Sequence, residues 1–221
     1  MPHGFAKASP CSEAKSAEVD RPDMRQRIKA LAVNLLIKHG YRGVSFGDIA
    51  DGLSTTRANI HYHFGNKNSL VEEVTDEYVT TTLARFHSIW TDGGTALDAK
   101  VDATIAFNRQ RYDLFNVGGD HGQSWSLVAR MRTDSDALSP RSIASVRRFA
   151  FELTNAVRIG VANAVDRGEL VPDTPVDDIV VQLVSIVIGA GLITHDAAHF
   201  DQLERIYRAF LRTVIAAYGR S

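Results

Sequence analysis

Hydrogen-bonding side chains are concentrated in one short stretch of this 221-residue chain, residues 55–67. Arginine can donate two parallel hydrogen bonds to guanine, and asparagine can pair with adenine in the same way. Hydroxyl, imidazole and amine groups suit phosphate oxygens. These residue types predict recognition of double-stranded DNA, and the alternative is an ordinary solvated helix start. The candidates for base contact are Arg57, Asn59 and His61; those for phosphate contact are Ser45, Thr56, Tyr62, His63 and Lys67, with Thr55 beside them.

Two short helices are expected to position these side chains. Ser45 is followed three residues later by Asp48, the spacing of a capping box. Apolar residues at 46, 49, 50 and 53 then fall on one helical face. Thr56 can cap a second helix after a turn of about three residues. The pattern predicts a helix-turn-helix motif at about 45–64, in which Ala58, Ile60 and Phe64 face inward.

The same stretch closely resembles the TetR family of bacterial transcriptional regulators. The matching features are His39-Gly40-Tyr41, then residues 44–50, then residues 60–64 followed by Asn66, Lys67 and Leu70. One departure is Gly52, which stands two residues before the turn position where the family often has glycine. The resemblance implies an all-α fold with two domains. Residues 22–82 would form a three-helix DNA-binding domain, and residues 83–221 a helical domain for effector binding and dimerisation.

Charge is divided between these two parts. The net charge is −1, but residues 1–70 carry 10 Lys and Arg against 6 Asp and Glu, whereas residues 71–221 carry 15 against 20. Positive charge therefore gathers where phosphate contact requires it. Residues 1–21 have little to bury and are expected to be disordered. They lack the apolar run of a signal peptide, and the single cysteine, Cys11, excludes an internal disulfide, so we expect a cytoplasmic protein.

Helical periodicity continues through the rest of the chain, without strand signals. We expect nine or ten helices. The first begins near Asp23 and ends at Gly40, and its Arg25, Arg27 and Lys29 could reach phosphates, although solvated charge is the alternative. A helix starting at Asn66 or Ser69 should continue past the DNA-binding unit. Further helices are expected at about 95–115, 124–132, 141–167, 179–193 and 201–217.

The resemblance places a small-molecule effector pocket between about Ala96 and Leu153. Aromatic and soft apolar side chains with a few polar anchors would suit such a pocket, and an ordinary aromatic core is the alternative. Nothing in the sequence identifies the effector. The candidate lining residues are Phe107, Arg111, Tyr112, Phe115, Trp125, Met131 and Phe149.

The last two helices are expected to form a two-fold interface. The apolar run 179–193 is shorter than the roughly 20 residues that a membrane span needs, so no membrane partner is expected. Ser185 and Gly189 lie four residues apart and would let a second helix come close. The alternative is that both helices only close the protomer core. The interface candidates are Val181, Val184, Ser185, Ile188, Gly189, Leu192, Tyr207, Phe210, Leu211 and Val214.

Other chemistry is poorly supported by the sequence. Asp113, His121 and Ser124 lack the elbow of a hydrolase nucleophile, and His195 and His199 lack an obvious third metal ligand. We therefore expect no enzyme, metal or cofactor. The reading is a homodimeric, effector-responsive repressor on a pseudo-palindromic operator. The rival readings are an architectural, non-specific DNA-binding dimer and a small-molecule-binding protein with a vestigial helix-turn-helix.

Overall fold

A computed structural model describes residues 23–119 and 122–220, so the predicted tail at 1–21 and Cys11 lie outside the described residues. The described residues confirm the all-α fold. Their one strand-like pairing is an isolated bridge between Leu170 and Gly219. The nine α-helices are α1 Met24–His39, α2 Phe46–Gly52, α3 Arg57–Phe64, α4 Lys67–Trp90, α5 Leu97–Phe115, α6 Leu127–Thr133, α7 Pro140–Asp166, α8 Val176–Ala197 and α9 Asp201–Tyr218, and two short 3-10 helices are η1 Val117–Gly119 and η2 Ser135–Ala137.

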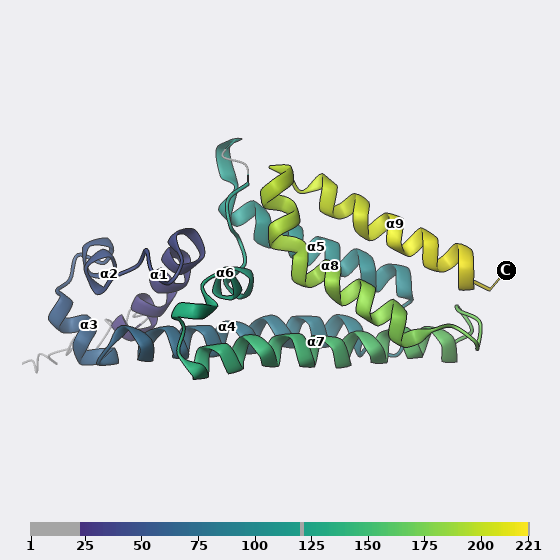
Figure 1. Ribbon diagram of the computed structural model, residues 1–221, viewed down its shortest axis with the longest axis horizontal. Coiled ribbons are helices and arrows are strands. Elements are labelled where there is room, and N and C mark those ends of the chain that lie inside the picture. The colour runs from purple at the N-terminus through teal and green to yellow at the C-terminus, as the bar shows by residue number, and fades with distance from the viewer. Residues whose placement is uncertain (1–22, 120–121, 221) are drawn as a thin grey trace, which may run out of the picture.

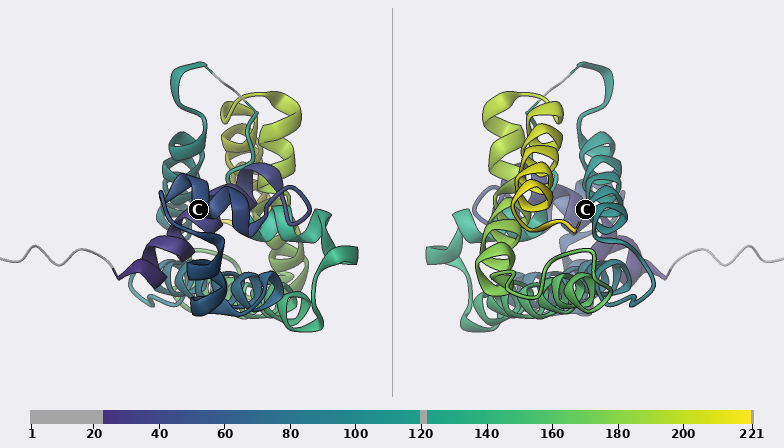
Figure 2. Two further views of the ribbon diagram at one scale, coloured as in Figure 1. Left: turned by 90° about the vertical axis from the view of Figure 1, so that its left-hand side faces the viewer. Right: turned by 90° about the vertical axis from the view of Figure 1, so that its right-hand side faces the viewer.

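The long helices α4 and α7 lie side by side along the molecule, with α1–α3 at one end and α5, α8 and α9 stacked over the other (Figure 1). Figure 2, which looks along this axis, shows α4 and α7 on one side and α8 and α9 on the other. Gly160 of α7 permits the close approach to α4, because a Cβ atom there would lie 2.5 Å from the Trp90 ring. Helix α6 sits between the two ends of the molecule.

The predicted helix starts are confirmed by their capping bonds. Ser45 Oγ accepts from the Asp48 amide at 3.3 Å, and Asp48 Oδ2 accepts from the Ser45 amide at 2.7 Å, which completes the capping box. Thr56 Oγ1 accepts from the Asn59 amide at 3.2 Å. Asn66, rather than Ser69, caps α4, since its Oδ1 accepts from the Ser69 amide at 2.9 Å.

The turn between α2 and α3 lacks a glycine where one would be expected. Ser54 adopts φ 51°, the left-handed conformation that costs a residue with a side chain about 1 kcal/mol. The Ser54 amide donates to the Asp51 carbonyl at 3.2 Å, and the Thr55 amide donates to the Ala50 carbonyl at 2.9 Å. The earlier Gly52 has a different role, because a Cβ there would lie 2.7 Å from a Leu31 methyl group of α1.

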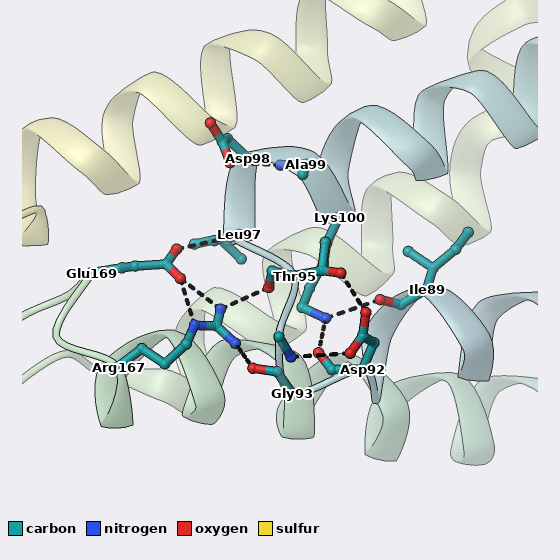
Figure 3. Close-up of polar contacts among 11 residues, drawn as sticks. Ile89, Asp92, Gly93, Thr95, Leu97, Asp98, Ala99, Lys100, Arg167 and Glu169 are labelled. Atoms are coloured by element: carbon teal, nitrogen blue, oxygen red, sulfur yellow. Dashed lines mark hydrogen bonds and ion pairs between the residues drawn. The ribbon is translucent and has the colours of Figure 1, made fainter.

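A polar junction joins α4, α5 and the end of α7 at the far end of the molecule (Figure 3). Lys100 is 0% exposed, and its Nζ donates to the carbonyls of Ile89 at 3.0 Å and Asp92 at 2.5 Å. Arg167 donates to the Thr95 carbonyl at 2.7 Å and pairs with Glu169, which accepts from the Leu97 amide at 2.8 Å. Every charge at this junction therefore has a partner.

Helix α8 is longer than the sequence predicted. It spans 22 residues and begins with Asp177 and Asp178 in its first turn. It is the one helix in the described part of the chain that is long and apolar enough to cross a membrane, with a mean hydropathy of 2.0 over its most apolar 18 residues. The prediction that this helix is too short to span a membrane, which rested on the 15-residue apolar run, was therefore wrong. One such helix is weak evidence for a membrane span, because a core helix of a soluble protein can have the same length and composition.

Candidate functional site: a helix-turn-helix face and an interior cavity

Helix α3 presents a polar surface to solvent. Tyr62 is 84% exposed, and Thr56, Arg57 and His61 are also exposed, whereas Asn59 and His63 are half-buried. Ile60 and Phe64 are buried and hold the helix on the domain core. The residues expected to contact bases and phosphates therefore begin at the N-terminal end of one outward face.

Ala58 was predicted to face inward, and that prediction was wrong: it is exposed, one turn before Tyr62. The helical period explains this, because positions 60 and 64 share the buried face and position 58 falls outside it. An exposed alanine methyl on such a face suits apolar contact with the methyl group of thymine.

Several of the candidate side chains are held by neighbours on α2. The guanidinium of Arg57 lies against Gly47, where a Cβ would be 2.7 Å from its Nη2. His61 packs edge-on against Phe46 with ring centroids 4.7 Å apart, and its Nδ1 lies 2.8 Å from the Gly65 carbonyl. Since a carbonyl only accepts, Nδ1 carries the hydrogen of this bond. Nε2 is the ring nitrogen left to face a base edge or a phosphate.

Lys67 is the first residue of α4 and lies over the ring of Tyr41, 4.1 Å from its centroid. Burial lowers the pKa of Lys67. The Tyr41 hydroxyl donates to Asn68 Oδ1, which fixes the ring beneath the amine. The amine therefore stands beside the free amides of a helix N-terminus, an arrangement that favours an anion such as phosphate.

Two of the three α1 cations considered for phosphate contact fasten α1 to α4 instead. Lys29 is buried, with its Nζ 2.6 Å from Glu77 Oε1 and 3.2 Å from Glu73 Oε1. Arg25 pairs with both oxygens of Glu73 and lies over the Phe64 ring at 4.7 Å. Arg27 is exposed. The sequence could not reveal these pairs, because the partners lie 48 residues apart.

The C-terminal end of α6 contacts the loop that follows α1. Asp134 Oδ2 accepts from the Tyr41 amide at 2.6 Å, and Arg42 pairs with Asp136 at 2.6 Å. Gly40, at φ 74°, leaves room for this contact, since a Cβ there would lie 2.7 Å from Arg130 Nε. These bonds connect the helix-turn-helix end of the molecule to a helix of the other end.

The opposite surface of α6 lines a cavity of about 20 Å³ inside the helix bundle. Helices α4 to α8 all contribute to its wall, and most of the lining is apolar. The exceptions are two guanidinium groups and a few neutral polar side chains. The lining residues are Phe86, Asn108, Arg111, Trp125, Ser126, Val128, Ala129, Arg132, Phe149, Val187, Ile188, Ala190 and Gly191.

Three of the seven predicted pocket residues, Arg111, Trp125 and Phe149, line this cavity. Phe107, with Arg111, lines an open groove of about 610 Å³ between α1, α4 and α5. Met131 lines a second groove of about 260 Å³ between α6 and α7. Tyr112 packs on Phe200 with ring centroids 5.5 Å apart, and Phe115 lines none of these three hollows.

The predicted interface residues divide into two groups. Tyr207 is 0% exposed and its hydroxyl accepts from Asn108 Nδ2 at 3.1 Å, while Val184 and Val214 are also buried. These three belong to the protomer core, so their assignment to an interface is corrected. The remaining seven are exposed or half-buried: Val181, Ser185, Ile188, Gly189, Leu192, Phe210 and Leu211.

No cluster of His, Cys, Asp and Glu able to hold a metal ion occurs within the described ranges. His195 pairs with the adjacent Asp196 at 3.3 Å, and His199 is exposed. His121 lies outside the described residues, and Asp113 is exposed.

The N-terminal helices match a known family. A profile described as bacterial regulatory proteins, tetR family, matches residues 28–74, which run from α1 into α4. The chain is also similar to the HTH-type transcriptional repressor AcnR of Corynebacterium glutamicum, with 25% identity over 171 residues covering 77% of this chain and 81% of that protein. AcnR of Corynebacterium efficiens is 24% identical over the same coverage.

Solved structures share most of the arrangement of helices. A TetR-family regulator from Agrobacterium tumefaciens superimposes with a TM-score of 0.74 at 19% identity, covering 86% of this chain and 96% of that chain. The reduced form of Escherichia coli NemR gives a TM-score of 0.70 at 15% identity, covering 85% and 95% respectively. At these identities the likeness establishes the fold alone.

Proposed function

We propose, from the premise that this chain belongs to the TetR family, that it is a homodimeric repressor released from its operator by a small-molecule effector. As a member of this family it is a DNA-binding transcriptional regulator. The observation that carries the proposal is the exposed polar face of α3, with Arg57 and His61 supported by α2. The names of the two relatives support repression. We place the protein in the cytoplasm and assign it no catalytic step.

The homodimer would present one α3 helix from each protomer to successive major grooves, about 34 to 36 Å apart on a pseudo-palindromic operator. An unpartnered apolar surface on α8 supports dimerisation, since Val181 is 63% exposed and Leu192 is 66% exposed. In this assignment residues 22–82 bind DNA and residues 83–221 bind the effector and the second protomer. Helix α4 belongs to both parts.

Effector release follows from the position of α6. A cavity of about 20 Å³ holds roughly one water molecule, so any larger compound must widen it. Ser126 and Ala129 form part of the wall, and the end of the same helix binds Tyr41 through Asp134. Widening the cavity would therefore move the DNA-binding helices. The effector can shift this equilibrium only by its difference in affinity for the two conformations.

The test is a fluorescence-anisotropy titration on DNA from upstream of the protein's own gene and on a scrambled duplex, at about 50 and 200 mM salt. We expect tight, salt-sensitive binding to the upstream DNA alone. Equal, weak binding to both, followed by failure of a selection from random duplexes to find a preferred site, would contradict the proposal and favour the non-specific or vestigial readings.

Two variants separate base reading from phosphate binding. Arg57→Ala should reduce the preference for the operator over the scrambled duplex by about 10-fold, because a lost bidentate base contact costs about 1–3 kcal/mol. Lys67→Ala should weaken binding to both duplexes and flatten the salt slope by about one unit. Arg158→Ala, which removes an exposed cation of α7 paired with Asp177, is the charge-matched control. Equal losses for Arg57→Ala and Lys67→Ala on both duplexes would contradict the two assignments.

A further inference from the structure

Arg111 of α5 is a cation without a counter-charge. Its Nη2 is enclosed by protein and has no hydrogen-bond partner, and the residue forms no ion pair with any described residue. Instead, the rings of Tyr78, Phe107 and Trp125 surround the guanidinium, with centroids 5.0, 5.3 and 5.5 Å from its Cζ. Burial lowers the pKa of Arg111 to about 10, so the group is still charged at neutral pH.

Arg132 of α6 is a second such cation on the same cavity. It lies 5.9 Å from the centroid of the Phe149 ring, and it makes no hydrogen bond or ion pair within the part of the chain that the structure describes. Burial lowers the pKa of Arg132 as well. Two half-buried guanidinium groups line one cavity of about 20 Å³ that has no carboxylate in its lining, so their positive charge has no counter-charge there.

Arg109 is an arginine of α5 with a structural role, and its contacts can be compared with those of Arg111. It lies on the same helix and also stacks on a ring, that of Phe200, at 4.3 Å. Its Nη2, however, is 3.2 Å from Asp201 and 2.7 Å from Glu204 of α9. Aromatic stacking alone therefore does not account for the missing partner of Arg111, since the neighbouring stacked arginine has two carboxylates.

The two grooves beside the cavity are also cationic. Arg111 lines both the cavity and the α1–α4–α5 groove, which carries Lys29, Arg85 and a single acid, Glu77, already paired with Lys29. Arg132 lines both the cavity and the α6–α7 groove, which carries Arg147 and no acid. Residues 71–221 have an excess of acids overall, so this local excess of cations runs against the composition of the region.

We propose that the effector is an organic anion, a carboxylate on an apolar body, whose charge supplies the counter-ion that Arg111 and Arg132 lack. The planar guanidinium groups match a carboxylate, and the apolar body would lie against Phe86, Phe149 and Val187. This inference rests on the proposed function in taking the interior cavity as the effector site. Cations are repelled there, and neutral compounds leave both guanidinium groups unpaired.

The first experiment measures ligand-induced stabilisation of the full chain without DNA, at fixed protein concentration, by thermal unfolding and calorimetry. The probes are matched pairs that differ in charge and little in shape: benzoate and benzamide, phenylacetate and phenylacetamide, octanoate and octanamide. We expect at least one carboxylate to bind and raise Tm, and its amide to bind at least 10-fold more weakly. Amides that bind as well as the acids, or a complete absence of carboxylate binding, would overturn the proposal.

Variants then locate the binding. Arg111→Met and Arg132→Met should each weaken the best carboxylate by about 30-fold or more, the loss expected when one member of a buried charge pair is removed. Arg109→Met is the matched control, and its affinity should change less than about threefold while its Tm falls with the lost ion pairs. Unchanged affinity in both Arg111→Met and Arg132→Met would contradict the assignment. If Arg111→Met does not fold, Arg111→Lys serves instead, with retained charge and a loss of about 10-fold.

Operator binding is measured separately by anisotropy, so the two proposals can fail independently. Carboxylate binding without DNA affinity would overturn the proposed repressor and leave the anion site intact. Operator binding without any response to the carboxylates, in solution or on the complex, would overturn the anion site and leave the proposed repressor intact.

Discussion

Helix α5 carries a cation near each end, one fully buried and one half-buried, and the two differ in their hydrogen-bond partners. Lys100 is fully buried and its amine donates to the carbonyls of Ile89 and Asp92, whereas the enclosed Nη2 of Arg111 has no partner. Burial lowers the pKa of both groups. Ile89 lies in the last turn of α4, where carbonyls have no helical partner, so Lys100 completes the end of that helix. The comparison separates a buried charge that holds the fold together from one that is left available to a ligand.

The largest expected effect tests this difference directly. Lys100→Met removes the donor and leaves two carbonyls unsatisfied, so we expect the free energy of unfolding to fall by about 3 kcal/mol. Arg111→Met keeps a similar volume and removes an unpaired charge, so it should change stability by less than about 1 kcal/mol, or increase it. Chemical denaturation of both variants without ligand is the measurement. Similar losses for the two would remove the distinction between them.

A smaller effect concerns pH. Removing a carboxylate that pairs with a cation should change stability in a way that depends on pH, whereas the carbonyls that accept from Lys100 do not titrate. The hydrogen bond from Arg25 holds the pKa of Glu73 below its ordinary value of 4.5. The Glu73 contribution is therefore fully present above about pH 4.5 and is lost as pH falls through the lowered pKa. We expect Glu73→Gln to destabilise the protein by about 1–2 kcal/mol at pH 7, and by progressively less as the pH falls through the lowered pKa of Glu73.

Denaturation curves of Glu73→Gln and wild type across this range measure the loss. The effect of Lys100→Met, measured in parallel, should change less over the same range, because the hydrogen bonds that it removes go to carbonyls and the Asp92 carboxylate acts on Lys100 only through its charge. A Glu73→Gln effect that does not change with pH would show that packing rather than charge joins α1 to α4.

The smallest expected effect concerns the wall of the cavity. A Cβ at Gly191 of α8 would lie 3.0 Å from Ala129 Cβ of α6, so Gly191→Ala should push α6 away by a few tenths of an ångström. Under the proposed coupling, the affinity for the operator should fall about threefold. The stability of the protein need not fall, because alanine favours a helix over glycine by up to about 1 kcal/mol. Anisotropy titration measures the change. Gly93→Ala is the control, because a Cβ there meets no atom within 4 Å. Unchanged affinity in Gly191→Ala would indicate that α6 does not transmit the strain.

The extent to which sequence predicts this molecule depends on how far apart the interacting residues lie. The caps at Ser45, Thr56 and Asn66 join residues three positions apart, so the starts of α2 and α3 could be predicted from the chain, and that of α4 could be narrowed to Asn66 or Ser69. Tyr207 was assigned to the two-fold interface but lies in the protomer core, because its hydrogen-bond partner, Asn108, is 99 residues distant in the sequence. An apolar stripe shows that a helix face is covered, and it does not show whether the cover is the same chain or another copy.

The candidate sites follow the same rule. The exposed residues of α3 were named from about two turns of sequence, but Arg132 was missed because its place on the cavity is set by five helices together. Arg111 was named for its residue type. Its missing partner, which carries the argument about the ligand, is visible only once every neighbour has been placed.

The continuity of α4 limits how this protein could be re-engineered as a biosensor. A single helix runs unbroken from Lys67 to Trp90, so a chimera that exchanges the sensing half must join the two sequences within a continuous helix. Each inserted or deleted residue would rotate one half against the other by about 100° and shift it by about 1.5 Å. Functional fusions should therefore recur only at insertion lengths close to whole turns, so that helical phase decides which chimeras respond.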